Sequence, residues 1–110
     1  RQFVDAAQAT FPLVSIVTVT YNSGAFLPAF VDSIRRNTTW PNFEVIFFDN
    51  ASSDGSQAYL EEVSRADPRF RLTLSAVNHG FAGGNNRAVR EARGEYLIIQ
   101  NPDTMVTPGW

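Results

Sequence analysis

Three short polar clusters in the sequence carry side chains that could do chemistry, and each directly follows an apolar, strand-like run. They are Thr20-Tyr21-Asn22, Asp49-Asn50 and Asn101-Pro102-Asp103. An aromatic ring such as that of Tyr21 can lie against a nucleobase, and a carboxylate such as that of Asp49 can accept a hydrogen bond from a base or a ribose. The Asp103 carboxylate can hold Mg²⁺ or Mn²⁺, and one protein carboxylate is enough when a diphosphate supplies further oxygens.

Each cluster also has an ordinary structural explanation when it is taken alone. Asn-Pro-Asp is a common turn, the segment from Asp49 to Ser56 fits an Asx-turn followed by a helix cap, and Tyr21 fits a core aromatic residue. The single histidine, His79, is more typical of a loop residue than of a metal ligand, because the chain has no second histidine and no cysteine to share a metal. Three polar strand ends in one chain together favour a binding site.

The segments between these clusters have the patterns of alternating strands and helices. Continuous apolar runs predict strands over residues 13–20, 43–48, 70–77 and 95–100. Helical spacing predicts helices over residues 24–36, from a cap at Ser53 or Asp54 to Ser64, and from the segment 80–86 through Ala92 with Gly94 as the C-terminal cap. This order predicts one α/β domain over residues 1–110, with a doubly wound, mainly parallel sheet and helices on both faces.

The predicted fold gives the polar clusters a common location. In an open α/β sheet, ligands bind outside the carboxyl ends of the strands, at the point where the strand order reverses, and all three clusters follow strand ends. Gly80, Gly83 and Gly84 stand where a helix is expected to begin. Glycines there permit close approach of the backbone, and the free N–H groups of a helix start favour anions.

The composition excludes several kinds of active site. All nine basic residues are arginine, and the 110 residues include no cysteine. A Walker P-loop and a Schiff-base enzyme both need a lysine, while a thiol nucleophile, a disulfide and a cysteine-ligated zinc site need cysteine. The net charge of −2 predicts no sequence-independent attraction to nucleic acid, so we expect a small partner.

Other α/β classes lack their signatures in this sequence. A dinucleotide-binding fold needs Gly-x-Gly-x-x-Gly directly after the first strand, where this chain has Tyr21-Asn22-Ser23-Gly24. A response-regulator receiver would pair Asp49 with an acidic cluster and a later lysine, and a serine hydrolase would show a Gly-x-Ser-x-Gly elbow. No apolar run approaches the roughly 18 residues of a membrane span and no signal peptide opens the chain, which predicts a cytoplasmic protein.

Four motifs, in this order, resemble those of family 2 glycosyltransferases of the GT-A fold, whose donor-binding half is Rossmann-like. The motifs are Val14 to Asn22, Asp49 to Ser56, Asn78 to Asn86 and Gly94 to Thr104. The resemblance covers residues 13–110, and the Asn-Pro-Asp sequence most resembles the rhamnosyltransferase-like bacterial members that build polysaccharides. It implies a metal-dependent, inverting transfer of a sugar from a UDP-, dTDP- or GDP-sugar to an acceptor hydroxyl.

The resemblance also implies roles for individual residues. Tyr21 and Asp49 would contact the nucleobase, the backbone around Val19 and Thr20 would line the same pocket, and Asp103 would bind the divalent cation on the donor diphosphate. Asn101 stands at the first acidic position of the family's Asp-x-Asp motif. The full set of candidate nucleotide-sugar-binding residues is Val19, Thr20, Tyr21, Asn22, Asp49, Gly83, Asn86, Asn101, Pro102 and Asp103.

The family continues beyond this length with an acceptor-binding half, which normally supplies the catalytic base. We therefore expect residues 1–110 to be the donor-binding part of a longer enzyme, with a glycan or lipid-linked acceptor and a location in the cytoplasm or at the inner face of the membrane. Two alternatives remain open. One is a non-catalytic nucleotide-binding or interaction module of the same fold, and the other is a domain that associates through apolar surface at its edge.

Overall fold

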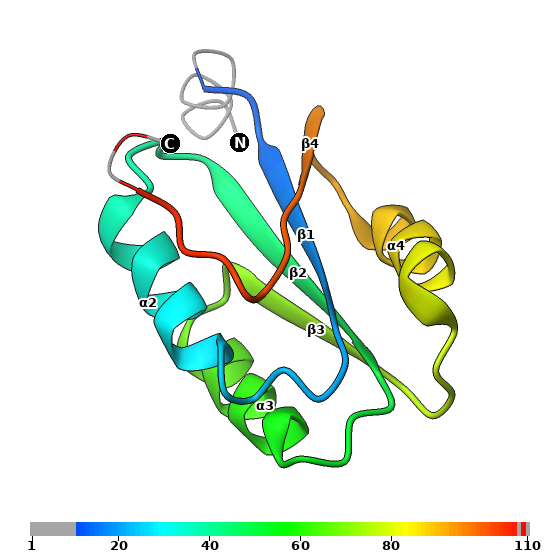
Figure 1. Ribbon diagram of the computed structural model, residues 1–110. Coiled ribbons are helices and arrows are strands. Elements are labelled where there is room, and N and C mark those ends of the chain that lie inside the picture. The colour runs from blue at the N-terminus through cyan, green and yellow to red at the C-terminus, as the bar shows by residue number, and fades with distance from the viewer. Residues whose placement is uncertain (1–10, 108, 110) are drawn as a thin grey trace.

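The computed structural model describes residues 11–107 and 109 as a four-stranded sheet with three helices (Figure 1). The strands and helices follow one another in the order β1 (Val14–Thr20), α2 (Leu27–Asn37), β2 (Phe43–Asn50), α3 (Ser56–Ala66), β3 (Phe70–Ser75), α4 (Gly80–Glu91) and β4 (Tyr96–Ile99). The strands lie in the order β3-β2-β1-β4, and all three neighbouring pairs are parallel. The predicted α/β fold with a doubly wound parallel sheet is confirmed.

Helices cover both faces of the sheet, and each face has its own apolar cluster. On one face, Ile16 and Phe47 pack with side chains of α2 and α3, among them Phe30 and Leu60. On the other face, the alternate strand residues, including Val17 and Phe48, pack against Ala88 of α4. Figure 1 shows α2 and α3 on one side of the sheet and α4 on the other. Because successive strand residues point to opposite faces, strands covered on both sides must be apolar at nearly every position.

The element boundaries differ from the predicted ones where tertiary contacts decide them. β2 runs two residues further, through Asp49 and Asn50, because both residues still pair with β3. α3 begins at Ser56 and runs to Ala66, since Gly55 precedes it in the left-handed conformation with φ of 89°. Asp54 nevertheless stabilises this helix start, because its Oδ1 accepts hydrogen bonds from the N–H and the hydroxyl of Ser56.

Gly94 does not cap α4, and this prediction was wrong. The helix ends at Glu91 with Ala92 as the C-cap residue. Gly94 instead lies against β1, where an added Cβ would stand 2.5 Å from Ser15 Oγ and 2.7 Å from the Leu13 carbonyl oxygen. Glycine is needed here for the close approach of the chain to β1 as it enters β4.

The side chains of the edge strand β4 are not covered by other described residues. All four of its residues, Tyr96–Ile99, are exposed, although their sequence is apolar. Among the described strands, β4 pairs with β1 alone, so the outer edge of β4 is unpaired.

In the part of the chain that the structure describes, no helix is long and apolar enough to cross a membrane.

A buried carboxylate joins four elements at the amino-terminal end of the sheet. Glu44 is 3% exposed and accepts hydrogen bonds from the Ser15 hydroxyl (2.6 Å), Arg71 Nη1 (3.0 Å) and the Arg93 N–H (2.8 Å). Burial raises the pKa of the Glu44 carboxyl, but these hydrogen bonds and the Arg71 charge outweigh burial and hold the pKa below its usual value of 4.5. The cluster thereby fixes the segment between α4 and β4 onto β1 and β2.

We expect Glu44 to make the protein acid-sensitive. Since its pKa is lowered by folding, its contribution to stability is complete above about pH 4.5 and is lost as the pH falls through the lowered pKa. Replacement of Glu44 by Gln should lower the free energy of unfolding at pH 7 by about 2 kcal/mol and flatten the acid limb of the stability curve. Urea unfolding from pH 3 to pH 7 measures both effects. Glu62→Gln, on an exposed position of α3, is the control, and equal acid limbs in the two variants would contradict the prediction.

Candidate functional site

The carboxyl ends of β1, β2 and β4 bring the three polar clusters to one edge of the sheet. Thr20 lies opposite Asp49 in the parallel register of β1 and β2. Val17 lies opposite Ile99, and the Gln100 N–H donates to the Val17 carbonyl (3.0 Å), so residues 101–103 follow beside the end of β1. The chain order reverses between β1 and β4, which is where an open α/β sheet forms its ligand crevice.

Asp49 is the most tightly held of the predicted site residues. Its side chain is fully buried, and its two oxygens accept four hydrogen bonds. Oδ1 accepts from the hydroxyls of Thr20 and Ser52, each at 2.6 Å. Oδ2 accepts from the Ser52 N–H and from Gln57 Nε2, each at 2.9 Å. The sequence analysis missed Ser52 and Gln57 as partners. The polar segment after β2 signalled Ser52, whereas only the fold brings Gln57 of α3 back onto the strand end.

The loops after β1 and β2 are joined by side chain to backbone hydrogen bonds. The Asn22 N–H donates to Ser52 Oγ (2.8 Å), and Asn22 Oδ1 accepts from the Ser53 N–H (2.8 Å). Asn22 adopts a left-handed backbone with φ of 49°, which an asparagine tolerates better than most residues. Tyr21 precedes it with its side chain 53% exposed. The joined loops therefore fix the backbone from which the Tyr21 ring projects.

A third bond between these loops involves Asp54. Its Oδ2 accepts from the Gly24 N–H at 2.9 Å. The hydrogen bonds from the Ser56 hydroxyl, the Gly24 N–H and the Ser56 N–H lower the pKa of the Asp54 carboxyl. Asp54 thus belongs to the scaffold that shapes the two loops.

The start of α4 is attached to the same edge of the sheet through Asn50. Asn50 is 2% exposed, its Oδ1 accepts from the His79 N–H (3.1 Å), and its Nδ2 donates to the Gly80 carbonyl (3.0 Å). Gly84 makes this approach possible, since an added Cβ would lie 2.8 Å from Val19 Cγ1 and 2.9 Å from Asn50 Nδ2. Val19 itself is 8% exposed, so it contributes mainly backbone to any pocket at this edge.

The two α4 residues of the predicted site lie one turn apart. Gly83 is half-buried, and an added Cβ would meet His79 Cβ at 3.1 Å. Asn86 is exposed in the second turn of the helix. Both residues are thus placed at the end of α4 that Asn50 holds against the sheet.

Residues 101–104 form a compact turn after β4. Thr104 donates its N–H (3.3 Å) and its hydroxyl (2.7 Å) to the Asn101 carbonyl, and Gln100 Nε2 donates to Thr104 Oγ1 (2.6 Å). Pro102 is half-buried, while Asn101 and Asp103 are exposed. The chain is anchored again at Val106, whose N–H donates to Ser33 Oγ on α2 (3.2 Å). The turn therefore presents the Asp103 side chain to solvent from a fixed backbone.

The donor set at this turn fits a hard divalent cation only if a ligand completes the shell. Within the described residues, no group of three or more His, Cys, Asp or Glu side chains could hold a metal ion. The Asp103 carboxylate accepts no hydrogen bond from any residue of that part of the chain, and the Asn101 side chain offers an amide oxygen nearby in sequence. Mg²⁺ is commonly bound by one or two carboxylates together with substrate phosphates, so Asp103 is chemically suited to that arrangement.

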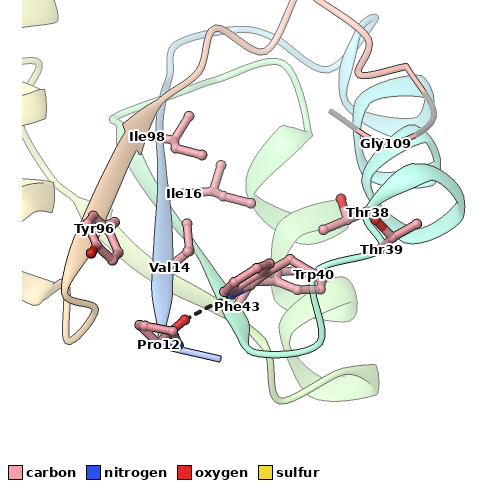
Figure 2. Close-up of a pocket in the computed structure, with 10 residues that line it drawn as sticks. All are labelled: Pro12, Val14, Ile16, Thr38, Thr39, Trp40, Phe43, Tyr96, Ile98 and Gly109. Carbon is pink, nitrogen blue, oxygen red and sulfur yellow. Dashed lines mark hydrogen bonds between the residues drawn. The ribbon is translucent and has the colours of Figure 1, made fainter. Parts of the chain in front are cut away.

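One groove lies away from these strand ends. Its volume is about 610 Å³, and Figure 2 shows it over Val14 and Ile16 of β1, between β4 and the segment after α2. Its lining is mainly apolar and includes Val14, Trp40, Phe43, Tyr96 and Ile98. Val14, Phe43 and Tyr96 are the first residues of their strands, so the groove occupies the amino-terminal end of the sheet. The groove is therefore separate from the polar edge.

Comparisons with known proteins identify relatives over most of this chain. The sequence profile described as "Glycosyl transferase family 2" matches residues 15–110. An uncharacterized glycosyltransferase of Haemophilus influenzae is 30% identical over 99 residues, which are 90% of this chain and 30% of the relative. The putative teichuronic acid biosynthesis glycosyltransferase TuaG of Bacillus subtilis is 30% identical over 92 residues, which are 84% of this chain and 36% of the relative.

Two solved structures have the same fold over most of this chain. The mannosyltransferase PcManGT from Pyrobaculum calidifontis, in complex with GDP-Man and Mn²⁺, superposes with a TM-score of 0.75 at 30% identity, covering 86% of this chain and 28% of its own. TarS of S. aureus in complex with UDP gives a TM-score of 0.76 at 25% identity, with the same coverage of 86% and 28%. The chain thus spans about a third of the length of the relatives it matches.

We expect Gly84 to be essential for seating α4 on the sheet. Alanine favours a helix over glycine by about 1 kcal/mol, yet Gly84→Ala should lower the free energy of unfolding by about 1–2 kcal/mol, because its Cβ would collide with Val19 and Asn50. Gly83→Ala, one position earlier in the same helix, should be close to neutral. Urea unfolding of both variants measures the difference, and an equal effect at the two glycines would contradict the prediction.

Proposed function

The chain belongs to glycosyl transferase family 2, and from this premise we propose that it binds a nucleotide-diphosphate-sugar donor for metal-dependent transfer of the sugar to an acceptor hydroxyl. The observation that carries the proposal is the convergence of an exposed aromatic ring, a buried carboxylate and an exposed carboxylate, from three different strand ends, at one edge of the sheet. The relation to TuaG favours synthesis of a polysaccharide or another cell-envelope glycan.

In this proposal the nucleoside lies at the ends of β1 and β2. Tyr21 is exposed and can stack on the base, while Asp49 stands beside it as the acceptor for a base or ribose donor. The backbone of Val19, Thr20 and Asn22 lines this pocket, with Gly83 and Asn86 of α4 at its border. Solved relatives with UDP and with GDP-Man support a UDP-, dTDP- or GDP-sugar as the donor.

The diphosphate lies toward the turn after β4. Asp103 would hold Mg²⁺ or Mn²⁺ there, and Asn101 and Pro102 shape the turn that presents it. When bound, the cation neutralises charge on the leaving diphosphate. The Mn²⁺ in the PcManGT complex supports this assignment.

The chain is, in this proposal, the donor-binding part of a longer enzyme. Within the described residues, the Asp49 and Asp54 carboxylates near the polar edge accept hydrogen bonds, and Asp103 is assigned to the proposed cation. None of these three is left to act as the general base that an inverting transfer requires. We assign that base to an acceptor-binding part, and the apolar, uncovered β4 is the surface on which that part packs.

The acceptor and the location of the enzyme remain predictions. A glycan or lipid-linked acceptor and a site of action in the cytoplasm or at the inner face of the membrane follow from the family resemblance alone. A non-catalytic module that only binds the nucleotide is the alternative, and it differs from the enzyme in being indifferent to the cation.

We expect Asp103→Ala to remove the dependence of nucleotide binding on metal. In titration calorimetry with Mn²⁺, the variant should bind UDP at least about tenfold more weakly than the unmodified chain, a difference of about 1.4 kcal/mol, whereas without Mn²⁺ the two should bind alike. UMP, which has one phosphate, should show little effect of either Mn²⁺ or the substitution. Asp32→Ala on the exposed side of α2 is the matched control. Binding of UDP that ignores both Mn²⁺ and Asp103 would favour the non-catalytic module.

We also expect the 110-residue chain to bind donor without transferring sugar. Incubation with UDP-, dTDP- or GDP-sugars and candidate acceptors should give no product above the uncatalysed background, because the described residues offer no free general base at the polar edge. Donor binding measured on the same preparation distinguishes an incomplete enzyme from an unfolded one. Turnover by this chain alone would refute the division into donor-binding and acceptor-binding parts.

A further inference from the structure

Asp49 has no hydrogen-bonding position left for a ligand. An ionised carboxylate offers about four acceptor sites, and here Thr20, Ser52 and Gln57 fill four of them. The side chain is also fully shielded from solvent. A nucleobase can therefore reach Asp49 only if one of these partners withdraws.

The three partners differ in how easily they can leave. Thr20 is fully buried in β1. Ser52 holds Asp49 through both its N–H and its hydroxyl, and the same hydroxyl accepts the Asn22 N–H that joins the two loops. Gln57 makes a single bond to Asp49, through Nε2, and is half-buried in the first turn of α3. Only Gln57 can rotate away without moving backbone, because its amide stands at the end of a flexible stem.

We propose that the Gln57 amide is an internal stand-in for the nucleobase. Its Nε2–H occupies the position on Asp49 Oδ2 that an N–H of the base takes when the donor binds, and Gln57 then turns out to solvent. This inference rests on the proposed function and adds to it a residue that sets both the affinity and the class of base.

The hydrogen bond from Gln57 to Asp49 predicts which nucleobases can replace the amide. The position on Asp49 Oδ2 accepts an N–H, and uracil and thymine offer N3–H while guanine offers N1–H at the corresponding edge. Adenine and cytosine offer at that edge only an exocyclic amino N–H, and the lone pair of adenine N1 or cytosine N3 beside it would face the carboxylate. The site is therefore selective for uridine, thymidine or guanosine diphosphates over adenosine and cytidine diphosphates.

The Gln57 bond also lowers affinity, because the base must compete with it. A ligand that binds only the open form of a site has its apparent affinity reduced by the fraction of molecules that are open. Removal of the amide increases that fraction without touching a group that contacts the nucleotide. The expected result is tighter binding, which is the opposite of what loss of a direct contact would give.

Calorimetric titration of the 110-residue chain tests this inference. With Mn²⁺ present, Gln57→Ala should bind UDP and GDP about three- to tenfold more tightly than the unmodified chain, and ADP and CDP should bind weakly to both. Gln57→Asn, whose shorter side chain cannot reach Asp49, should behave like Gln57→Ala. Glu61→Ala, one turn further along the exposed side of α3, should leave every affinity unchanged. Thermal unfolding checks that each variant is folded.

The side-chain amide of Gln57 gives a second, direct measurement by NMR. In the free chain its Nε2 protons should exchange slowly with water, and UDP should shift them to the fast exchange of a solvated amide. Weaker or unchanged UDP binding by Gln57→Ala, or UDP binding that leaves the amide signal in place, would overturn the stand-in while leaving the proposed function intact. Equal affinities for UDP and ADP would overturn the selectivity. Failure of every nucleotide to bind any variant would instead refute the proposed function, and the stand-in with it.

Discussion

The parallel pairing of β1 with β2 and β4 is the constraint on which the rest of the structure depends. It places β1 in the centre of the sheet and sets Thr20 beside Asp49, with the Asn101–Asp103 turn following β4 on the other side. Because the strand order reverses next to β1, the ends of β1 and β4 stand where an open α/β sheet forms its ligand crevice. Every residue of the candidate site is positioned relative to this strand.

Two buried carboxylates, at opposite ends of β2, show how the same chemistry serves stability at one end and binding at the other. Glu44 is paired with the guanidinium groups of Arg71 and Arg93, so its charge is balanced within the chain. Asp49 is surrounded by neutral donors, two hydroxyls, one backbone N–H and one amide. Neutral donors form no ion pair with the carboxylate, unlike the guanidinium groups at Glu44, and the donors of a ligand can take their place. A buried carboxylate held in this way remains available for recognition, whereas an ion-paired one does not.

Much of the fold follows from local patterns in the sequence. The apolar β-branched run before Thr20 and the helical spacing around Phe30 each predicted the correct element, and the alternation of elements predicted the parallel sheet. Gly94 was misassigned because a glycine after a helix fits a C-cap equally well, and only the approach to Ser15 and Leu13 in the folded chain shows why it is needed. The bond from Gln57 to Asp49 was not predictable either, since Gln57 reaches Asp49 from a helix that follows it in the chain.

The uncovered β4 connects the candidate cation site to the acceptor-binding part proposed above. Within the described residues, β4 pairs with β1 alone, and its apolar residues are exposed on both faces, which is a costly arrangement for a sheet edge in water. The turn that carries Asp103 begins two residues after β4 ends, and its position depends on the pairing with β1 before it and on the anchor at Val106 after it. A part that packs on β4 would therefore also restrain this turn. In the proposed function, the nucleoside end of the site is built by β1, β2 and α3, whereas the diphosphate end depends on the turn that directly follows β4. Assembly of the two parts would in this way couple acceptor binding to the geometry of the leaving group.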